Sequence, residues 1–204
     1  MRKVIAARRD GEIEGQSETL RYLSKNNLNT ARLAAPPEPL RQGTILIPFR
    51  DPVQQAAAML RQHERFLEIH EEDDFVREYM KAIGHHEFGK GLKPIDFNEW
   101  LDGCSSNPEG LKFWVRYWTK AYQFALDQAG EEVAFVSYAR LTEEPDSALS
   151  DLAEVGELPT EDLVPLTGEL HAPHTHSVNR ARLPEPLLRE AKKTYEFLDR
   201  RAAV

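Results

Sequence analysis

Arg50 follows an apolar run at 44–49 whose β-branched residues are typical of a buried strand. Asp51 and Pro52 then open a run rich in Ala, Gln, Leu and Met, so Asp51 suits a helix N-cap and Pro52 the first helical turn. Arg50 is therefore predicted at the carboxyl end of a strand and beside a helix N-terminus, a position that suits phosphate or sulfate binding. The alternative is an ordinary strand–helix junction with a surface ion pair, and this segment alone does not distinguish the two.

Histidines occur in two further groups that could bind a metal or act in acid–base catalysis. The three histidines within 171–176 have a His-x-His spacing that could supply metal ligands, but the chain has no Cys pair and no His-Glu-x-x-His helix, so a metal site is not favoured. His85, His86 and Glu87 could supply a general base, because imidazole titrates near neutral pH. Neighbouring loop residues diverge, so a plain surface loop is the favoured interpretation of this second group. The sequence contains no Gly-x-Ser-x-Gly elbow, no Gly-x-Gly-x-x-Gly and no Gly-rich phosphate loop.

The elements that must position these residues alternate between strand and helix. We expect strands at 19–25, 44–49 and 132–138, and helices at 28–35, 52–71, 74–83, 111–129, 146–155 and 185–202. This order favours an α/β fold with a parallel sheet, right-handed crossovers and flanking helices, in one domain that covers 1–204 with 1–18 irregular. The aromatic residues of helix 111–129 are predicted to be core, and 156–178 is predicted to be loop.

Composition excludes several classes of partner. The formal net charge of −8 disfavours generic nucleic-acid binding, so any anion site has to be a local basic cluster. No apolar run approaches the roughly 20 residues that span a bilayer. The basic opening of the chain lacks the apolar segment of a secretory signal, and the single cysteine, Cys104, excludes an internal disulfide. We therefore expect a cytoplasmic protein without a nucleic-acid or membrane partner.

These residues resemble the sulfotransferase family that uses the sulfonate donor PAPS (3′-phosphoadenosine 5′-phosphosulfate). In that family a strand ends in Arg, Asn/Asp-Pro follows, and a serine eight positions after the Arg helps it to grip the donor's 3′-phosphate. Arg50, Asp51 and Pro52 match this pattern, and Ala58 stands at the serine position. An earlier strand of the family ends in a lysine near the transferred sulfonate, and Lys25 stands at the corresponding place here.

Two later segments extend the resemblance. Tyr138, followed by Pro145, resembles the Tyr-Glu-Asp-Leu segment whose tyrosine lies against adenine, although the acidic pair is lacking. The run from His176 to Arg180 resembles the segment that returns over the nucleotide, so Arg180 or Arg182 would contact a phosphate. The resemblance covers roughly 19–200.

The resemblance implies a P-loop-NTPase-like sulfotransferase fold and transfer of a sulfonate from PAPS to a hydroxyl or amine of a small molecule or carbohydrate, without a metal. Lys25 would neutralise charge on the sulfonate, and His86 is a candidate base. Self-association of the chain stays open as an alternative to a monomer. Residues 1–18 contain nothing like Pro-Lys-Ser/Thr-Gly-Thr-Thr, so the family's first strand and its phosphosulfate loop are expected to be missing. The chain would then be truncated or a degenerate member, and the alternative function is a catalytically inactive binding or interaction protein on the same scaffold.

Overall fold

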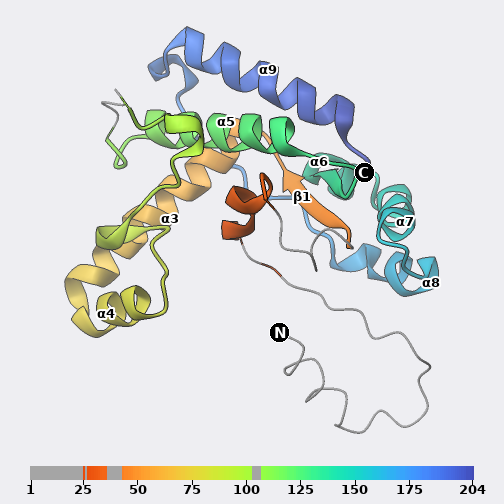
Figure 1. Ribbon diagram of the computed structural model, residues 1–204, viewed down its shortest axis with the longest axis horizontal. Coiled ribbons are helices and arrows are strands. Elements are labelled where there is room, and N and C mark those ends of the chain that lie inside the picture. The colour runs from red at the N-terminus through yellow and green to blue at the C-terminus, as the bar shows by residue number, and fades with distance from the viewer. Residues whose placement is uncertain (1–24, 26, 36–42, 103–106) are drawn as a thin grey trace, which may run out of the picture.

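The computed structural model describes residues 25, 27–35, 43–102 and 107–204 (Figure 1). The expected strand at 19–25, apart from Lys25, lies outside these residues, as do the segment 1–18 and Cys104. With 3-10 helices written as η, the described elements are η1 Asn27–Arg32, β1 Ile45–Phe49, α3 Pro52–Glu72, α4 Asp74–Ala82, η2 Gly89–Gly91, η3 Phe97–Glu99, α5 Leu111–Gln128, β2 Val133–Ser137, α6 Tyr138–Glu143, α7 Pro145–Val155, α8 Thr160–Leu163, η4 Val164–Glu169, η5 Arg180–Arg182 and α9 Glu185–Arg201.

The fold is a helix-rich α/β arrangement around a parallel pair of strands, as the sequence predicts. β1 pairs with β2 in a register that runs from Ile45 opposite Val133 to Phe49 opposite Ser137. The end of the chain lies along the other side of β2, where the Ser137 N–H donates to the Val204 carbonyl at 2.7 Å. β2 therefore lies between β1 and the last residues of the chain.

The side of β1 that faces away from β2 carries a proline. Because strand backbone groups alternate in direction and Ile45 donates to the β2 side, the backbone groups of Leu46 and Pro48 face away from β2. Proline has no N–H, and the Tyr122 hydroxyl donates to the Pro48 carbonyl at 2.6 Å. Burial raises the pKa of Tyr122 to about 12, so this hydroxyl stays protonated and remains a donor. At Pro48 the strand therefore offers no donor, and its acceptor is already engaged.

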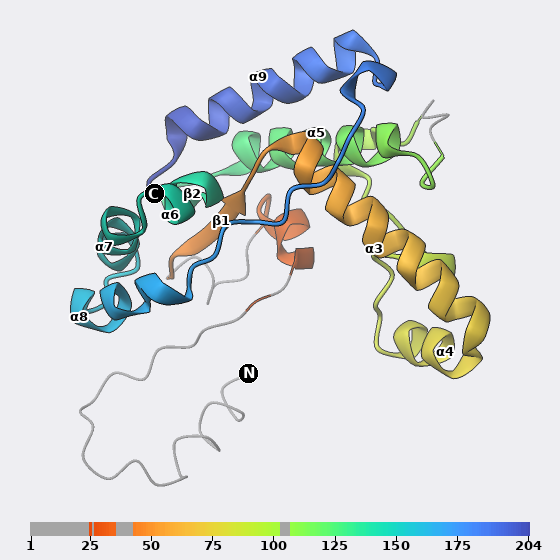
Figure 2. The same cartoon turned by 180° about the vertical axis from the view of Figure 1, so that it is seen from behind.

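Helix α5 is the centre of the core, as its aromatic residues predict. It runs between α3 and α9 (Figures 1 and 2), and Phe113, Trp114 and Trp118 are almost fully buried there. The two indole N–H groups have partners, since Trp114 donates to the Pro108 carbonyl at 2.7 Å and Trp118 to the Gln55 side chain at 2.9 Å. Among the described residues, no helix combines the length and the apolar character that crossing a bilayer requires.

Local signals place most helix starts correctly, with one important shift. Asp51 caps α3 by accepting the Gln54 N–H at 2.8 Å, and Pro52 is the first helical residue, both as predicted. The sequence predicts Tyr138 as the last residue of a strand at 132–138, and this prediction is wrong. β2 ends at Ser137, whose hydroxyl accepts the Arg140 N–H and so starts α6 at Tyr138.

Smaller corrections concern the connecting segments. The helix expected at 28–35 is the shorter 3-10 turn η1, and the helix expected at 146–155 begins one residue earlier, at Pro145. The predicted loop at 156–178 contains α8 and η4. Proline is favoured in the first turn of a helix, which explains the earlier start of α7.

Helix α4 forms where the spacing of Phe75, Tyr79 and Ile83 predicts it, at the end of α3 that points away from the sheet (Figure 1). These three side chains are nevertheless 74%, 54% and 49% exposed, and the rings of Phe75 and Tyr79 stack on each other with centroids 6.0 Å apart. The apolar stripe of this helix therefore faces outward from the described part of the molecule.

Two buried histidines of α3 hold the loop that follows α4. The Gly89 N–H donates to Nδ1 of His63 at 3.0 Å, and the Lys90 N–H donates to Nδ1 of His70 at 3.2 Å. Each Nδ1 is therefore an unprotonated acceptor, and each neutral ring carries its hydrogen on Nε2. Burial lowers the pKa of both histidines, and for His70 the nearby Arg77 and Lys90 lower the pKa further.

This pair predicts that stability falls in mild acid. Because the folded pKa values lie below the ordinary value near 6.5, the unfolded chain takes up protons first as the pH drops. The contribution of these two histidines to the free energy of unfolding should be constant above about pH 6.5. At lower pH this contribution should decrease, by at most about 1.4 kcal/mol per pH unit for each histidine. Urea unfolding at pH 7.5 and pH 5 measures the change.

Asparagine can place its side-chain oxygen near the position of Nδ1 without titrating. The double variant His63→Asn, His70→Asn should therefore lose much of the pH dependence, while the exposed His85→Asn variant should keep it. Equal pH profiles for the double variant and the unmodified chain would show that other groups cause the acid sensitivity.

Candidate functional site

The carboxyl ends of β1 and β2 bring two of the predicted site residues together. Phe49 and Ser137 are opposite each other in the strand register. Arg50 follows Phe49 in the sequence, and Tyr138 follows Ser137. Neighbouring strands are about 4.8 Å apart, so both residues start from the same short edge of the sheet. Arg50 is half-buried and Tyr138 is partly exposed at the start of α6.

The segment 171–180, which connects η4 to η5, lies across this edge (Figure 2). A guanidinium nitrogen of Arg50 donates to the His174 carbonyl at 3.4 Å. The Tyr138 hydroxyl donates to the His171 carbonyl at 3.3 Å. Both side chains therefore contact this segment through its backbone, and the predicted place of the run from His176 to Arg180 over a nucleotide stays a prediction.

The first turn of α3 holds the same segment more firmly. The Gln54 side chain donates to the His176 carbonyl at 3.1 Å and accepts the His176 N–H at 2.7 Å, which satisfies both backbone groups of that residue. A few residues later, the Arg180 guanidinium pairs with the Asp51 carboxylate at 3.0 Å. The helix cap and the segment 171–180 are thus joined by one amide and one ion pair. The sequence does not predict the role of Gln54, since a polar side chain in the first helical turn is its one signal.

Positive groups gather at this edge. Burial lowers the pKa of His176, and the nearby Arg61, His174 and Arg50 lower the pKa further by charge repulsion. The rings of His174 and His176 are in contact, with centroids 4.9 Å apart. Nδ1 of His176 is buried without a hydrogen-bond partner among the described residues. An anion at this edge would be attracted to Arg50 and Arg61, and it would accept a hydrogen bond from Nδ1 of His176 where that nitrogen carries the hydrogen.

Ala58 and Lys25 contribute less to the geometry. Ala58 is half-buried on α3, about two helical turns from Arg50, and its methyl group offers no hydrogen bond where the family pattern has a serine. Lys25 is exposed, and the rest of the strand expected to carry it is outside the described residues. The role of Lys25 remains a prediction.

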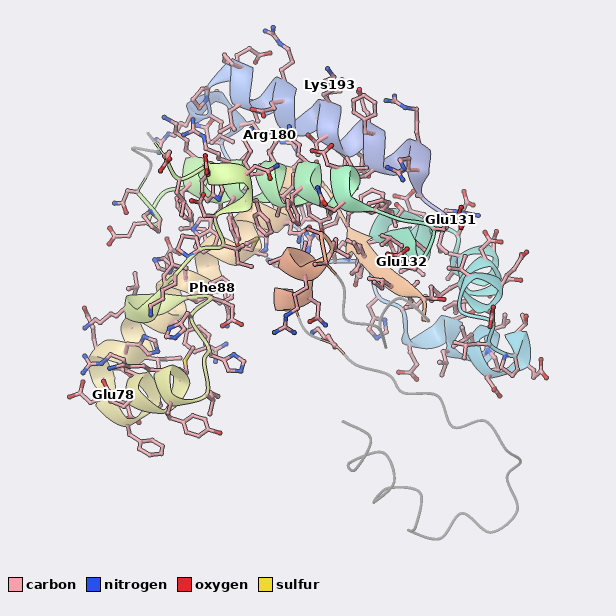
Figure 3. All side chains as sticks on the ribbon, in the orientation of Figure 1. Glu78, Phe88, Glu131, Glu132, Arg180 and Lys193 are labelled. Carbon is pink, nitrogen blue, oxygen red and sulfur yellow. The ribbon has the colours of Figure 1, made fainter. Side chains whose placement is uncertain are left out.

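His86 does not lie at this edge. It borders a cavity with His70, which belongs to the last turn of α3, while Arg50 precedes the first turn. A helix of 21 residues is about 30 Å long, so the two ends of α3 keep His86 far from Arg50. In Figure 3, Glu78 and Arg180 mark these two ends. Nδ1 of His86 donates to the Gly91 carbonyl at 3.2 Å, and the side chain belongs to the loop after α4.

Within the ranges that the structure describes, no three His, Cys, Asp or Glu side chains come together as a group able to hold a metal ion. Comparison of the chain with protein-family models, with curated proteins and with solved structures gives no match. The assignment of a function therefore depends on the residues and geometry of the strand edge.

Proposed function

We propose that the edge formed by Arg50, Tyr138 and the segment 171–180 binds the nucleotide of PAPS, and that the chain is a sulfotransferase of the PAPS-dependent type. The observation that carries this proposal is the half-buried residue Arg50 at the carboxyl end of a parallel strand, beside other positive groups and an unpartnered imidazole nitrogen. Arginine suits a phosphate because its planar guanidinium can donate two parallel hydrogen bonds.

Each contact has a proposed role. Arg50 would bind the 3′-phosphate, Tyr138 would lie against the adenine, and Arg180 would approach a phosphate by leaving its ion pair with Asp51. That ion pair is exposed, and exposed pairs contribute little, so exchanging the carboxylate for a phosphate has a low free-energy cost. Ala58 lacks the hydroxyl of the family pattern, and the missing contact would weaken binding by about 1 kcal/mol.

The proposed reaction is an in-line displacement in the cytoplasm. A hydroxyl or amine of a small-molecule or carbohydrate acceptor attacks the sulfur of PAPS, and the bond from sulfur to the 5′-phosphate oxygen breaks. The electron pair of that bond stays on the phosphate, so 3′,5′-ADP leaves, and the acceptor releases its proton to a base or to water. Lys25 would neutralise charge on the transferring sulfonate.

A second candidate is a protein on the same scaffold that binds the nucleotide without transferring the sulfonate. Two observations favour it. The sequence has no Gly-rich phosphate loop to hold the 5′-phosphosulfate, and His86, the candidate base, lies at the far end of α3 from Arg50.

Titration of the full chain with 3′,5′-ADP, the product of the donor, tests the site shared by both candidates. We expect heat of binding in a calorimeter and a melting temperature that rises with ligand concentration. The absence of both would overturn the proposed function. If the nucleotide binds, incubation with PAPS and a panel of hydroxyl and amine acceptors separates the candidates, because only the enzyme releases 3′,5′-ADP in step with a sulfated product.

A further inference from the structure

A second concave site lies at the other end of α3, between the end of that helix, α4 and the loop 85–93. Its volume is about 280 Å³, which is near the lower limit for small-molecule pockets. Four basic side chains line it, Arg77, Lys81, Lys90 and Lys93, and Glu78 is the one carboxylate among the lining residues. Asp74, Glu71 and Glu87 lie beside the lining as the partners of Arg77, Lys90 and His85, so the excess of positive charge is confined to the lining itself.

Carboxylates pair with some of the positive side chains of this cavity, but these ion pairs are weak. Arg77, Lys81 and Lys90 each have a carboxylate partner at 3.2 to 3.7 Å, and the side chains of these pairs are 38% to 82% exposed. Ion pairs this exposed are worth about 0–1 kcal/mol, so a ligand with several negative charges can replace the carboxylates. Lys93 has no carboxylate within ion-pair distance in the described ranges of the chain.

The loop that presents Lys90 and Lys93 is anchored at several points. Its backbone donates to the buried His63 and His70 at Gly89 and Lys90, and the Lys93 N–H donates to the His86 carbonyl at 2.8 Å. These bonds fix the backbone from which the two lysines extend. A ligand therefore meets side chains whose starting points are already in place, which lowers the ordering cost of binding.

His86 adds a directional group to the cavity. A carbonyl oxygen only accepts, so the contact with Gly91 at 3.2 Å makes Nδ1 of His86 the donor. Nε2 is then the remaining ring nitrogen of a side chain that lines the cavity. It can accept a hydrogen bond from a protonated ligand oxygen or, on a protonated ring, donate one to a ligand oxygen.

We propose that this cavity binds a small, multiply charged oxyanion, such as a diphosphate or a compact phosphorylated or sulfated metabolite. Lys93 and Lys90 supply the main charge, and His86 supplies a directional hydrogen bond. The cavity is separate from the strand edge around Arg50, so this proposal does not depend on the proposed function.

Calorimetric titration with inorganic pyrophosphate, at constant ionic strength, tests the proposal. The unmodified chain should bind one pyrophosphate and melt at a higher temperature in its presence. Lys93→Gln should weaken binding about tenfold, and Lys93→Gln with Lys90→Gln about a hundredfold, as one or two charge-assisted contacts are lost. Lys192→Gln, on an exposed lysine of α9, makes the same charge change and should leave the affinity unchanged.

Two results would overturn the proposal. One is the absence of binding to the unmodified chain at 1 mM pyrophosphate, because a Kd above about 1 mM is too weak for a specific site. The other is equal weakening by Lys93→Gln and Lys192→Gln, which would indicate a non-specific effect of net charge. Arg50→Ala identifies which site the probe occupies. Unchanged pyrophosphate affinity supports the cavity, and loss of binding would place the probe at the strand edge and contradict the proposal.

Discussion

Replacing Arg50 by alanine is expected to weaken the binding of 3′,5′-ADP about 10- to 150-fold, because hydrogen bonds to a charged group contribute about 1.5 to 3 kcal/mol. The fold should tolerate the change. In the described structure the Arg50 side chain makes one hydrogen bond, a long one of 3.4 Å to the His174 carbonyl. Calorimetric titration of the variant measures the loss, and circular dichroism confirms that the variant is folded.

A truncated ligand identifies the group that Arg50 binds. The unmodified chain should bind 5′-AMP more weakly than 3′,5′-ADP, and Arg50→Ala should remove most of this difference because the 3′-phosphate has lost its partner. Arg189→Ala is the matched control, since it removes an arginine whose side chain is 75% exposed on α9. If Arg50→Ala keeps the preference for 3′,5′-ADP, the assigned role of Arg50 is wrong.

Replacing Gly89 by alanine should lower the free energy of unfolding by about 2 to 5 kcal/mol. Gly89 has φ of +71°, a region that costs other residues about 1 to 2 kcal/mol. An added Cβ would also lie 2.6 Å from Nδ1 of His70 and 3.0 Å from Cβ of Phe66, so the loop or the buried ring has to move. Overpacking of this kind adds about 1 to 3 kcal/mol. Urea unfolding at pH 7.5 measures the effect.

Gly84 offers a matched control in the same loop. Its φ is +78°, but a Cβ there meets no described atom within 4 Å. Gly84→Ala should therefore show the backbone cost alone, and the difference between the two variants measures the close approach of the loop to His70. Similar losses in both variants would contradict the argument that this approach is tight.

The sequence predicted the strand–helix junction at Arg50 well because its signals are local. An apolar run, an N-cap and a first-turn proline act within a few residues, and β1, Asp51 and Pro52 are placed as they indicate. The end of β2 was misjudged by one residue. Ser137 can either continue a strand or cap a helix, and its side-chain hydrogen bond to Arg140 decides between the two.

Contacts between distant residues could not be predicted in the same way. Gln54 and His176 are separated by 122 positions, and nothing in either neighbourhood indicates that they pair. The length of α3 keeps His86 far from Arg50, although the sequence alone is compatible with both acting in one reaction. The burial of His63 and His70 could not be predicted from the sequence, since the sequence does not distinguish a buried histidine of an amphipathic helix from an exposed polar residue.

The Pro48–Tyr122 contact also determines how the sheet can meet other molecules. Among the residues of β1, only Leu46 has an N–H that faces away from β2, because Pro48 has none and its carbonyl binds the Tyr122 hydroxyl. The far side of β2 is hydrogen-bonded to the end of the chain. An extended peptide that tried to add a strand would therefore find too few backbone partners on β1 and an occupied side on β2. We expect this small sheet to resist both edge-to-edge aggregation and recognition by β-augmentation, so partners that bind it should do so through side chains.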